Sequence, residues 1–561
     1  MSAEPTPVHR LLLATAQTGA GDHWRVQDLD ARGDPLSSAR SVGTAELRDL
    51  DTSRARWVCR DLSADYPPLW RAGVSLSRAH DLAATDRILR ARAGDVTAVP
   101  DPAPALPPLD DGPGLFDAVP GPRPPRRRAA AGSGADRPPA GIGGPDDARR
   151  QLVDQLAHTA GDGALRLLVA AESSAGLSAV EMTAAGLPWR ADRHRELLDE
   201  VLGARPGFGQ RPPRLAALVT AIGEAFGFPV NPDSPLELRS ALSRVGYAVE
   251  STRSSILREI PHPVVPLLLD YKERARLFTA NGWDWLDTWV RDGRFRPEYV
   301  PGGVVSGRWA SRGGGALQIP RALRRAVVAD PGHRLIVADA AQAEPRVLAA
   351  VSGDTGLRER AAAADLYDAL AADGFGGDRA RAKLSLLGAM YGATTGESGR
   401  LLPTLRRLYP QAMGHLQRAA DEGARGGTVT SVLGRACPPP SPSWRSTVEI
   451  GTQPDATAAE RSRADRLTAD RSRFTRNFVI QASAADWASV WLAQVRQALG
   501  PTAVVLFQHD EIVLHVPESG AADAAAAVTA AADSASALVF PGTGVRIPVD
   551  PAVVDSYADK T

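Results

Sequence analysis

The stretch VVLFQHDEIVL, from Val504 to Leu514, holds three polar side chains between two apolar runs. Its first half predicts a buried strand, His509, Asp510 and Glu511 predict a turn, and the apolar run then resumes as a second strand. Two adjacent carboxylates between buried strands are unfavourable unless a cation lies near them. The stretch therefore predicts a strand–turn–strand unit that carries a charged site.

A second apolar run, LIVAD from Leu335 to Asp339, also ends in a carboxylate. If the two strands lie side by side, Asp339 and Asp510 come together as oxygen ligands of the kind that Mg²⁺ prefers. Two Mg²⁺ ions about 3.5–4 Å apart are a known device for in-line phosphoryl transfer. Each carboxylate taken alone is more simply interpreted as a turn residue.

The stretch RARAKLSLLGAMYG, residues 379–392, predicts a helix on which Arg379, Lys383, Leu387 and Tyr391 recur every four residues. At about 100° per residue, these positions drift by only about 40° per step and share one broad face. Two cations one turn apart can hold a triphosphate, while the rest of the face packs against a base or sugar. An ordinary amphipathic helix is the alternative, although the chain contains only three Lys, so a Lys at this position is unexpected from composition.

The 561 residues include 65 Lys and Arg, 65 Asp and Glu, and two Cys, and 43% of them are hydrophobic. This composition excludes a disulfide scaffold and indicates a protein of several domains. No apolar run approaches the roughly 18 residues of a membrane span, and the first ten residues lack the pattern of a signal peptide. We therefore expect a cytoplasmic protein without a membrane partner.

The zero net charge is a sum of opposite local charges. Residues 301–350, 374–410 and 461–476 each carry an excess of four positive charges, whereas residues 501–561 carry an excess of six negative charges. This distribution suits a protein that binds a polyanion on one surface, although solvated Arg-rich faces would produce the same pattern.

A Pro-rich segment divides the chain. Thirteen prolines lie between Pro100 and Pro145, a composition that cannot bury enough apolar surface to fold. It predicts a linker between an N-terminal α/β module and a larger body, which is helical at first and has short strand-like runs from about Val300.

The three motif stretches, in this order, resemble those of the family A DNA polymerases, the bacterial DNA polymerase I family. Asp339–Arg346 resembles the first palm motif of that family, Arg379–Gly392 its nucleotide-binding fingers helix, and His509–Glu511 its last palm motif. Further matches are Phe228–Leu238, Ser306–Arg312, Asp365–Tyr367, Leu408–Pro410 and Arg473–Asp486. The resemblance covers roughly residues 180–561.

The resemblance implies an α+β right-hand polymerase with thumb, palm and fingers, preceded by a small α/β exonuclease-like domain. The implied ranges are 1–95 for a degenerate 3′–5′ exonuclease-like domain, 96–148 for the Pro-rich linker, 149–295 for a helical region and the thumb, 296–360 for the first part of the palm, 361–476 for the fingers and 477–561 for the second part of the palm. The implied activity is DNA-dependent DNA synthesis, with a role in repair or gap filling, in a nucleoid-associated protein.

The resemblance also implies roles for individual residues. Asp339 and Asp510 would ligate two Mg²⁺ ions, with Glu511 assisting. The incoming dNTP would meet Arg379 and Lys383 at its triphosphate, Glu344 as a steric gate against ribose, and Gln342, Leu387 and Tyr391 around the sugar and base. The primer–template DNA would contact Arg308, Arg473, Asn477, Gln481 and His509.

Several positions depart from the family pattern. Ala340 and Ala341 replace a Tyr and a small hydroxyl residue, Leu387 replaces an aromatic ring, and the stretch Cys437–Arg471 is longer and more irregular than expected. A catalytically weakened DNA-binding homologue is therefore an alternative to an active polymerase. An RNA-synthesising enzyme is a second alternative, against which Glu344 argues.

The N-terminal module faintly resembles part of an exonuclease domain in Arg60–Asp65 and His80–Leu82. Its predicted first strand, Leu11–Ala16, lacks the Asp-x-Glu that would hold metal, and Asp28–Asp30 predicts a turn, so we expect no exonuclease activity.

In the linker, Leu115 and Phe116 resemble the end of peptides that bind the bacterial sliding clamp, although a chance apolar pair is the simpler interpretation.

Overall fold

The computed structural model describes residues 8–14, 23–50, 55–95, 97, 144–312, 315, 319–393 and 396–560. Most of the predicted linker lies outside these ranges, as do Leu115 and Phe116 of the predicted clamp peptide.

The N-terminal module is built on a five-stranded mixed sheet of order β3-β2-β1-β4-β5. Its elements are β1 (His9–Ala14), β2 (His23–Leu29), β3 (Arg40–Gly43), α1 (Thr44–Asp49), β4 (Arg56–Cys59), α2 (Leu62–Arg71), β5 (Ala79–Asp81) and α3 (Leu82–Arg92). The predicted α/β character is confirmed. The prediction of a turn at Asp28–Asp30 is wrong for Asp28, because Asp28 lies on β2 opposite Arg10 of β1 and forms an ion pair with it.

Two helices connect this module to the body. Helix α4 (Pro145–Thr159) begins with Pro145 at its first turn, so the predicted linker boundary at 148/149 falls inside it. Ala148 and Leu152 of α4 pack with Leu11 and Val58 of the module. Helix α5 (Gly163–Ala185) follows, and its buried residues contribute both to the core of the module and to that of the body.

A helical arm with its own core follows. It comprises β6 (Leu187–Pro188), α6 (Ala191–Leu202), α7 (Pro213–Phe226), α8 (Pro235–Arg244), α9 (Ser254–Arg258), α10 (Val264–Asn281), α11 (Trp283–Trp289), β7 (Val290–Arg291) and β8 (Arg294–Phe295). Leu198, Ile222, Leu242 and Leu268 are buried together in this core. The predicted boundary at 295/296 coincides with the end of β8.

The centre of the body is a four-stranded antiparallel sheet of order β12-β13-β11-β14. Its strands are β11 (His333–Asp339), β12 (Val504–Gln508), β13 (Glu511–Pro517) and β14 (Ala552–Val554). Elements next to it are β9 (Glu298–Val300), β10 (Ala310–Arg312), η3 (Arg321–Ala326), α12 (Ala343–Ser352), η4 (Glu518–Gly520), α20 (Ala521–Val539) and η5 (Tyr557–Asp559). Leu335–Ala338 is fully buried, which explains its unbroken apolar sequence.

A second set of helices contains α13 (Thr355–Ala361), α14 (Leu366–Gly374), α15 (Arg379–Tyr391), α16 (Gly396–Leu408), α17 (Pro410–Ala424), α18 (Pro442–Thr452) and α19 (Ala458–Leu499). The predicted boundaries at 360/361 and 476/477 fall inside α13 and the 42-residue α19. The stretch Cys437–Arg471, which departs from the family pattern in sequence, is occupied mostly by α18 and the first turns of α19.

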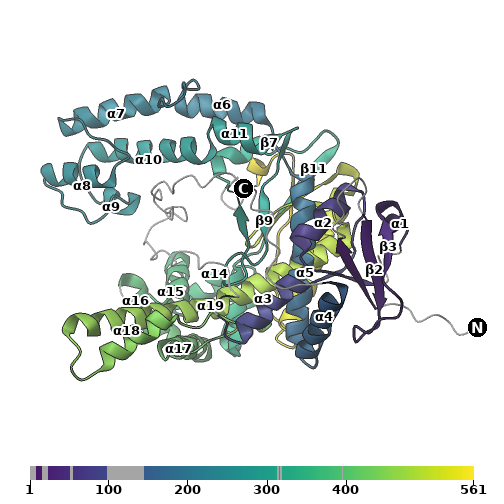
Figure 1. Ribbon diagram of the computed structural model, residues 1–561. Helices are drawn as coiled ribbons and strands as arrows, with labels where there is room; N and C mark the ends of the chain where they lie inside the picture. Colours follow the sequence, from purple (N-terminus) through teal and green to yellow (C-terminus); the bar gives the residue numbers. More distant parts are fainter. Residues whose placement is uncertain are drawn as a thin grey trace, which may run out of the picture.

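Figure 1 shows α6–α10 and α14–α18 projecting on the same side of the central sheet, with the N-terminal module on the opposite side of the molecule. Helix α19 runs from the tip of the second set back to the sheet. Among the helices of the described residues, none combines the length and hydrophobicity that a membrane crossing requires.

Candidate active site

The two predicted motif strands lie side by side, as expected. Asp339, the last residue of β11, is opposite Glu511, the first residue of β13. The amide of Ala340 donates to the carbonyl oxygen of Asp510 at 2.8 Å. The turn between β12 and β13 consists of His509 and Asp510, and His509 has a φ of 56° in the left-handed region. This backbone geometry brings Asp339 and Asp510 to one end of the sheet.

The carboxylates of Asp339 and Asp510 are exposed, and neither forms a side-chain hydrogen bond to another of the described residues. Loss of hydration and then the negative charge of Asp339 raise the pKa of Asp510 to about 7. Although Asp339 is exposed, the surrounding protein still removes part of its hydration, and this raises its pKa. Two repelling carboxylates without donors favour a bound cation.

Glu511 lies opposite Asp339 in the sheet, but its carboxylate already has partners within the fold. Its carboxylate is buried and accepts a hydrogen bond from the Tyr557 hydroxyl at 2.7 Å. The Lys560 ammonium lies 3.5 Å from it and the Arg324 guanidinium 3.7 Å from it. Arg324 also lies over the Tyr557 ring at 4.2 Å. Glu511 therefore ties the segment around η5 to β13.

Glu344 connects the sheet to α15. It accepts hydrogen bonds from the Arg308 guanidinium at 2.5 Å and from the Tyr391 hydroxyl at 2.7 Å. The charge of Arg308 lowers the pKa of Asp510 and the charge of Glu344 raises it, so both residues lie close to the carboxylate pair. The structure thus brings five predicted residues into one neighbourhood.

Helix α15 carries the predicted triphosphate ligands. Asp378 caps its first turn by accepting from the Arg381 amide at 3.0 Å, and Gly392, with a φ of 78°, ends it in the left-handed conformation. Lys383 is exposed and Leu387 packs, half-buried, against the main core. Arg379 is already paired: its guanidinium donates to Asp365 at 2.6 Å.

Gln342 and His509 play local roles at the sheet end. The Gln342 side-chain oxygen accepts from the Leu366 amide at 2.8 Å and so fixes the start of α14. Burial lowers the pKa of His509 to about 4, and its Nδ1 is buried without a hydrogen-bond partner among the described residues.

The remaining predicted DNA contacts lie on α19. Arg473 is exposed and pairs with Asp470, whereas Asn477 and Gln481 are buried at 3% and 7% exposure. Arg476 donates to the Ala389 carbonyl at 3.1 Å and so joins α19 to α15. Asn477 and Gln481 would therefore need a change in packing to contact DNA fully.

One buried ionic network was not predicted from the sequence. Arg435 donates to Asp486 of α19 and to Glu172 of α5, both at 2.9 Å, and all three are buried. A side chain at Gly307 would collide with the Arg435 guanidinium, so the network also packs against the turn that carries Arg308. The ion pair between Lys560 and Glu511 was not predicted either, although Lys560 is one of only three Lys in the chain, a rarity that could have indicated a role.

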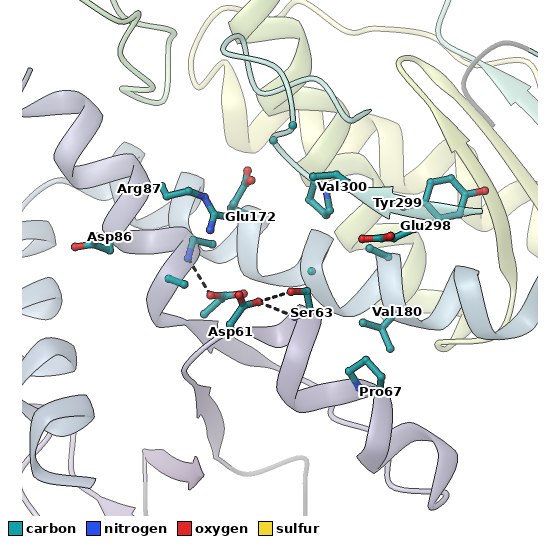
Figure 2. Close-up of a pocket in the computed structure, with 18 of the residues that line it drawn as sticks. Asp61, Ser63, Pro67, Asp86, Arg87, Glu172, Val180, Glu298, Tyr299 and Val300 are labelled. Atoms are coloured by element: carbon teal, nitrogen blue, oxygen red, sulfur yellow. Dashed lines mark hydrogen bonds between the residues drawn. The ribbon is translucent and has the colours of Figure 1, made fainter. Parts of the chain in front are cut away.

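A cavity of about 1740 Å³ lies elsewhere, between the N-terminal module and the body. Figure 2 shows its wall, where Asp61 hydrogen-bonds Ser63 at the start of α2. None of the predicted site residues lines this cavity.

The carboxylate pair fits a divalent cation that the substrate helps to bind. Within the described ranges, no group of three or more His, Cys, Asp or Glu side chains is placed to hold a metal. Mg²⁺ is commonly held by one or two carboxylates together with substrate phosphates and water, so two carboxylates are a sufficient protein contribution.

The sequence model of DNA polymerase family A matches residues 210–559, more than half of the chain. The chain belongs to DNA polymerase family A. Its α+β fold is that of this family, as predicted.

Two curated relatives show how far the similarity extends. The thermostable DNA polymerase I of Thermus filiformis is 30% identical over 310 residues, which are 50% of this chain and 35% of that protein. The DNA polymerase I of Chloroflexus aurantiacus is 28% identical over 352 residues, which are 54% of this chain and 35% of that protein. The matched region spans about a third of the length of these relatives.

A solved structure supports the fold over the whole chain. The POL domain of Pol1 from M. smegmatis, in complex with DNA primer-template and dNTP, superimposes with a TM-score of 0.65 at 18% identity. The match covers 99% of this chain and 96% of that one.

Proposed function

We propose that this family A member is a DNA-dependent DNA polymerase that adds dNTPs to a primer 3′-hydroxyl. One observation carries the proposal. The carboxylates of Asp339 and Asp510, which have no side-chain hydrogen bond among the described residues, lie close to Glu344. Glu344 in turn accepts a hydrogen bond from Tyr391, which is on the same helix as Lys383. Nucleotidyl transfer requires carboxylates that bind cations and an exposed ammonium that binds phosphates.

Asp339 and Asp510 would hold the divalent cations, Mg²⁺ in the cell, which would offset the negative charge of the triphosphate and lower the pKa of the attacking 3′-hydroxyl. Lys383 would bind the triphosphate, and Arg379 would bind it once the ion pair between Arg379 and Asp365 has broken. Glu344, fixed between Arg308 and Tyr391, would limit the space beside the sugar. Glu511 would position β13 through Tyr557 rather than touch substrate.

Arg308, Arg473, Asn477, Gln481 and His509 would contact primer and template. The proposed domain roles are a thumb in α6–α11, a palm around the central sheet and fingers in α13–α18 with the first half of α19. A role in repair or gap filling, and clamp binding through Leu115 and Phe116, remain predictions.

Primer extension tests the proposal. Wild-type protein with Mg²⁺ and a short primer–template is expected to incorporate the nucleotide complementary to the template, and Asp339→Asn is expected to abolish incorporation. Template-independent incorporation, or equal incorporation by Asp339→Asn, would refute it.

A second candidate is a DNA-binding homologue with weakened synthesis. It is favoured by Leu387, which offers no ring on the nucleotide-facing helix and packs into the core. Gel-shift binding of primer–template with no incorporation at any dNTP concentration would establish this alternative.

A further inference from the structure

The Arg379 guanidinium is held by a carboxylate on a neighbouring helix. It donates from Nη2 to Asp365 Oδ2 at 2.6 Å and from Nε to the same oxygen at 3.2 Å. Asp368 lies further away, with Oδ1 at 3.6 Å from Nε. The Tyr367 ring faces the guanidinium at 5.6 Å. Lys383, one turn along α15, is exposed and has no ion pair within the described residues.

Asp365 itself is held rigidly. Its Oδ1 accepts from the Asp368 amide at 3.0 Å and caps α14. The Gln342 side chain accepts from the amide of the next residue, Leu366. Arg346, only 1% exposed, donates to the carbonyls of Ala363 and Ala364, both at 3.0 Å. The anion therefore stays in place, and Arg379, 47% exposed in its side chain, is the partner that can move.

We infer that Asp365 is a resident counter-ion that competes with the nucleotide triphosphate for Arg379, and so sets nucleotide affinity without taking part in the chemical step. The inference rests on the proposed function of α15. A triphosphate bound to Lys383 lies within one helical turn of Arg379 and offers it more negative charge than Asp365 does. Asp365 is thus a positioning residue that acts through Arg379.

The test measures equilibrium binding of inorganic tripolyphosphate and of a dNTP to the full chain, without catalysis, together with KM and kcat in primer extension. Asp365→Asn keeps the helix cap, because Asn caps as well as Asp does, but removes the charge. We expect its Kd and KM to fall about twofold to fivefold, the range of a partly exposed ion pair, with kcat unchanged. Asp365→Ser, another capping residue, should behave in the same way.

Two controls separate ion-pair exchange from a general loss of negative charge. Asp368→Asn removes an equal charge on the same helix but a weaker contact, so it should change Kd less. In an Arg379→Ala background, Asp365→Asn should have no effect on Kd. Three results would overturn the inference. They are an equal fall of Kd in Asp368→Asn, a fall of Kd on Asp365→Asn that persists in the Arg379→Ala background, and an unchanged Kd in Asp365→Asn.

Failure of the proposed function gives a different result. Lys383→Ala is expected to weaken tripolyphosphate binding about tenfold or more. If Lys383→Ala binds normally, α15 is not the nucleotide site and both proposals fall. If Lys383→Ala loses binding and Asp365→Asn gains none, only the role of Asp365 is wrong.

Discussion

Two pairs of carboxylates follow strands in this molecule, one in the central sheet and one in the N-terminal module. Asp339 and Asp81 are the last residues of β11 and β5, and Asp510 and Asp61 lie two residues after the ends of β12 and β4. One carboxylate of each pair has a pKa raised to about 7, Asp510 in the first and Asp81 in the second, and loss of hydration is the first cause in both. The pKa shift alone therefore does not distinguish them.

Hydrogen bonding does distinguish them. Asp81 accepts from the amides of Leu62 at 3.1 Å and Ala84 at 2.9 Å and so caps α3. Asp61 accepts from the amide of Ser63 and so caps α2 (Figure 2). Asp339 and Asp510 have no such donors among the described residues. Carboxylates saturated by backbone amides stabilise helices, whereas unsaturated ones remain available to a cation. The absence of exonuclease activity in the module stays a prediction.

The largest expected difference between the pairs is in catalysis. Asp510→Asn is expected to lower primer extension by about 10³-fold or more, because it removes a cation ligand at the reacting centre. Asp61→Asn preserves the cap of α2 and is the matched control, expected to retain wild-type activity. Steady-state extension rates measure both, and a large loss in Asp61→Asn would break the comparison.

Low pH should destabilise the module, because unfolding allows a buried histidine to take up a proton. Burial is the main cause that lowers the pKa of His80 in β5 to about 4, and its Nε2 lies 2.7 Å from the Gln155 side-chain oxygen. The unfolded chain takes up this proton near pH 6.5 and the folded chain only near pH 4. The contribution of neutral His80 to the free energy of unfolding is therefore complete above pH 6.5. It falls by at most about 3 kcal/mol as the pH decreases toward 4.

Thermal unfolding of wild type and His80→Gln between pH 7.5 and 4.5 measures this effect. The variant is expected to lose less stability than wild type over that interval. Parallel pH profiles would show that His80 is not a neutral structural group.

The smallest predicted effect concerns stability at neutral pH. Asp81→Ala leaves the buried amides of Leu62 and Ala84 without an acceptor and should lower the free energy of unfolding by about 1–3 kcal/mol. Asp510→Ala removes repulsion with Asp339 and should cost nothing. Denaturant unfolding distinguishes the two, and a greater loss in Asp510→Ala would contradict the assigned roles.

Local sequence signals predicted the strands and helix that carry the site. The apolar runs before Asp339 and Asp510 had to be buried, and the recurrence from Arg379 to Tyr391 required a helix, so the motif elements follow from patterning alone. Helix α18 was missed because none of its described residues is buried, and its signals are only the Ser441 cap and the adjacent Pro442.

Long-range partners could not be predicted. Arg435 meets Glu172 across 263 residues, and Glu511 meets Tyr557 across 46, so no local pattern indicates that these charges are neutralised within the fold. The pairing of Arg379 with Asp365, 14 residues earlier, depends in the same way on how α14 packs against α15.

We propose that Asp339 and Asp510, and not the carboxylates of the module, form the cation site. Mn²⁺ titration followed by electron paramagnetic resonance, with primer–template and dNTP present, tests it directly. Wild type and Asp61→Asn/Asp81→Asn are expected to bind Mn²⁺ alike, and Asp339→Asn/Asp510→Asn is expected to lose this binding. Retained binding in the Asp339→Asn/Asp510→Asn variant, or lost binding in a folded Asp61→Asn/Asp81→Asn variant, would contradict it.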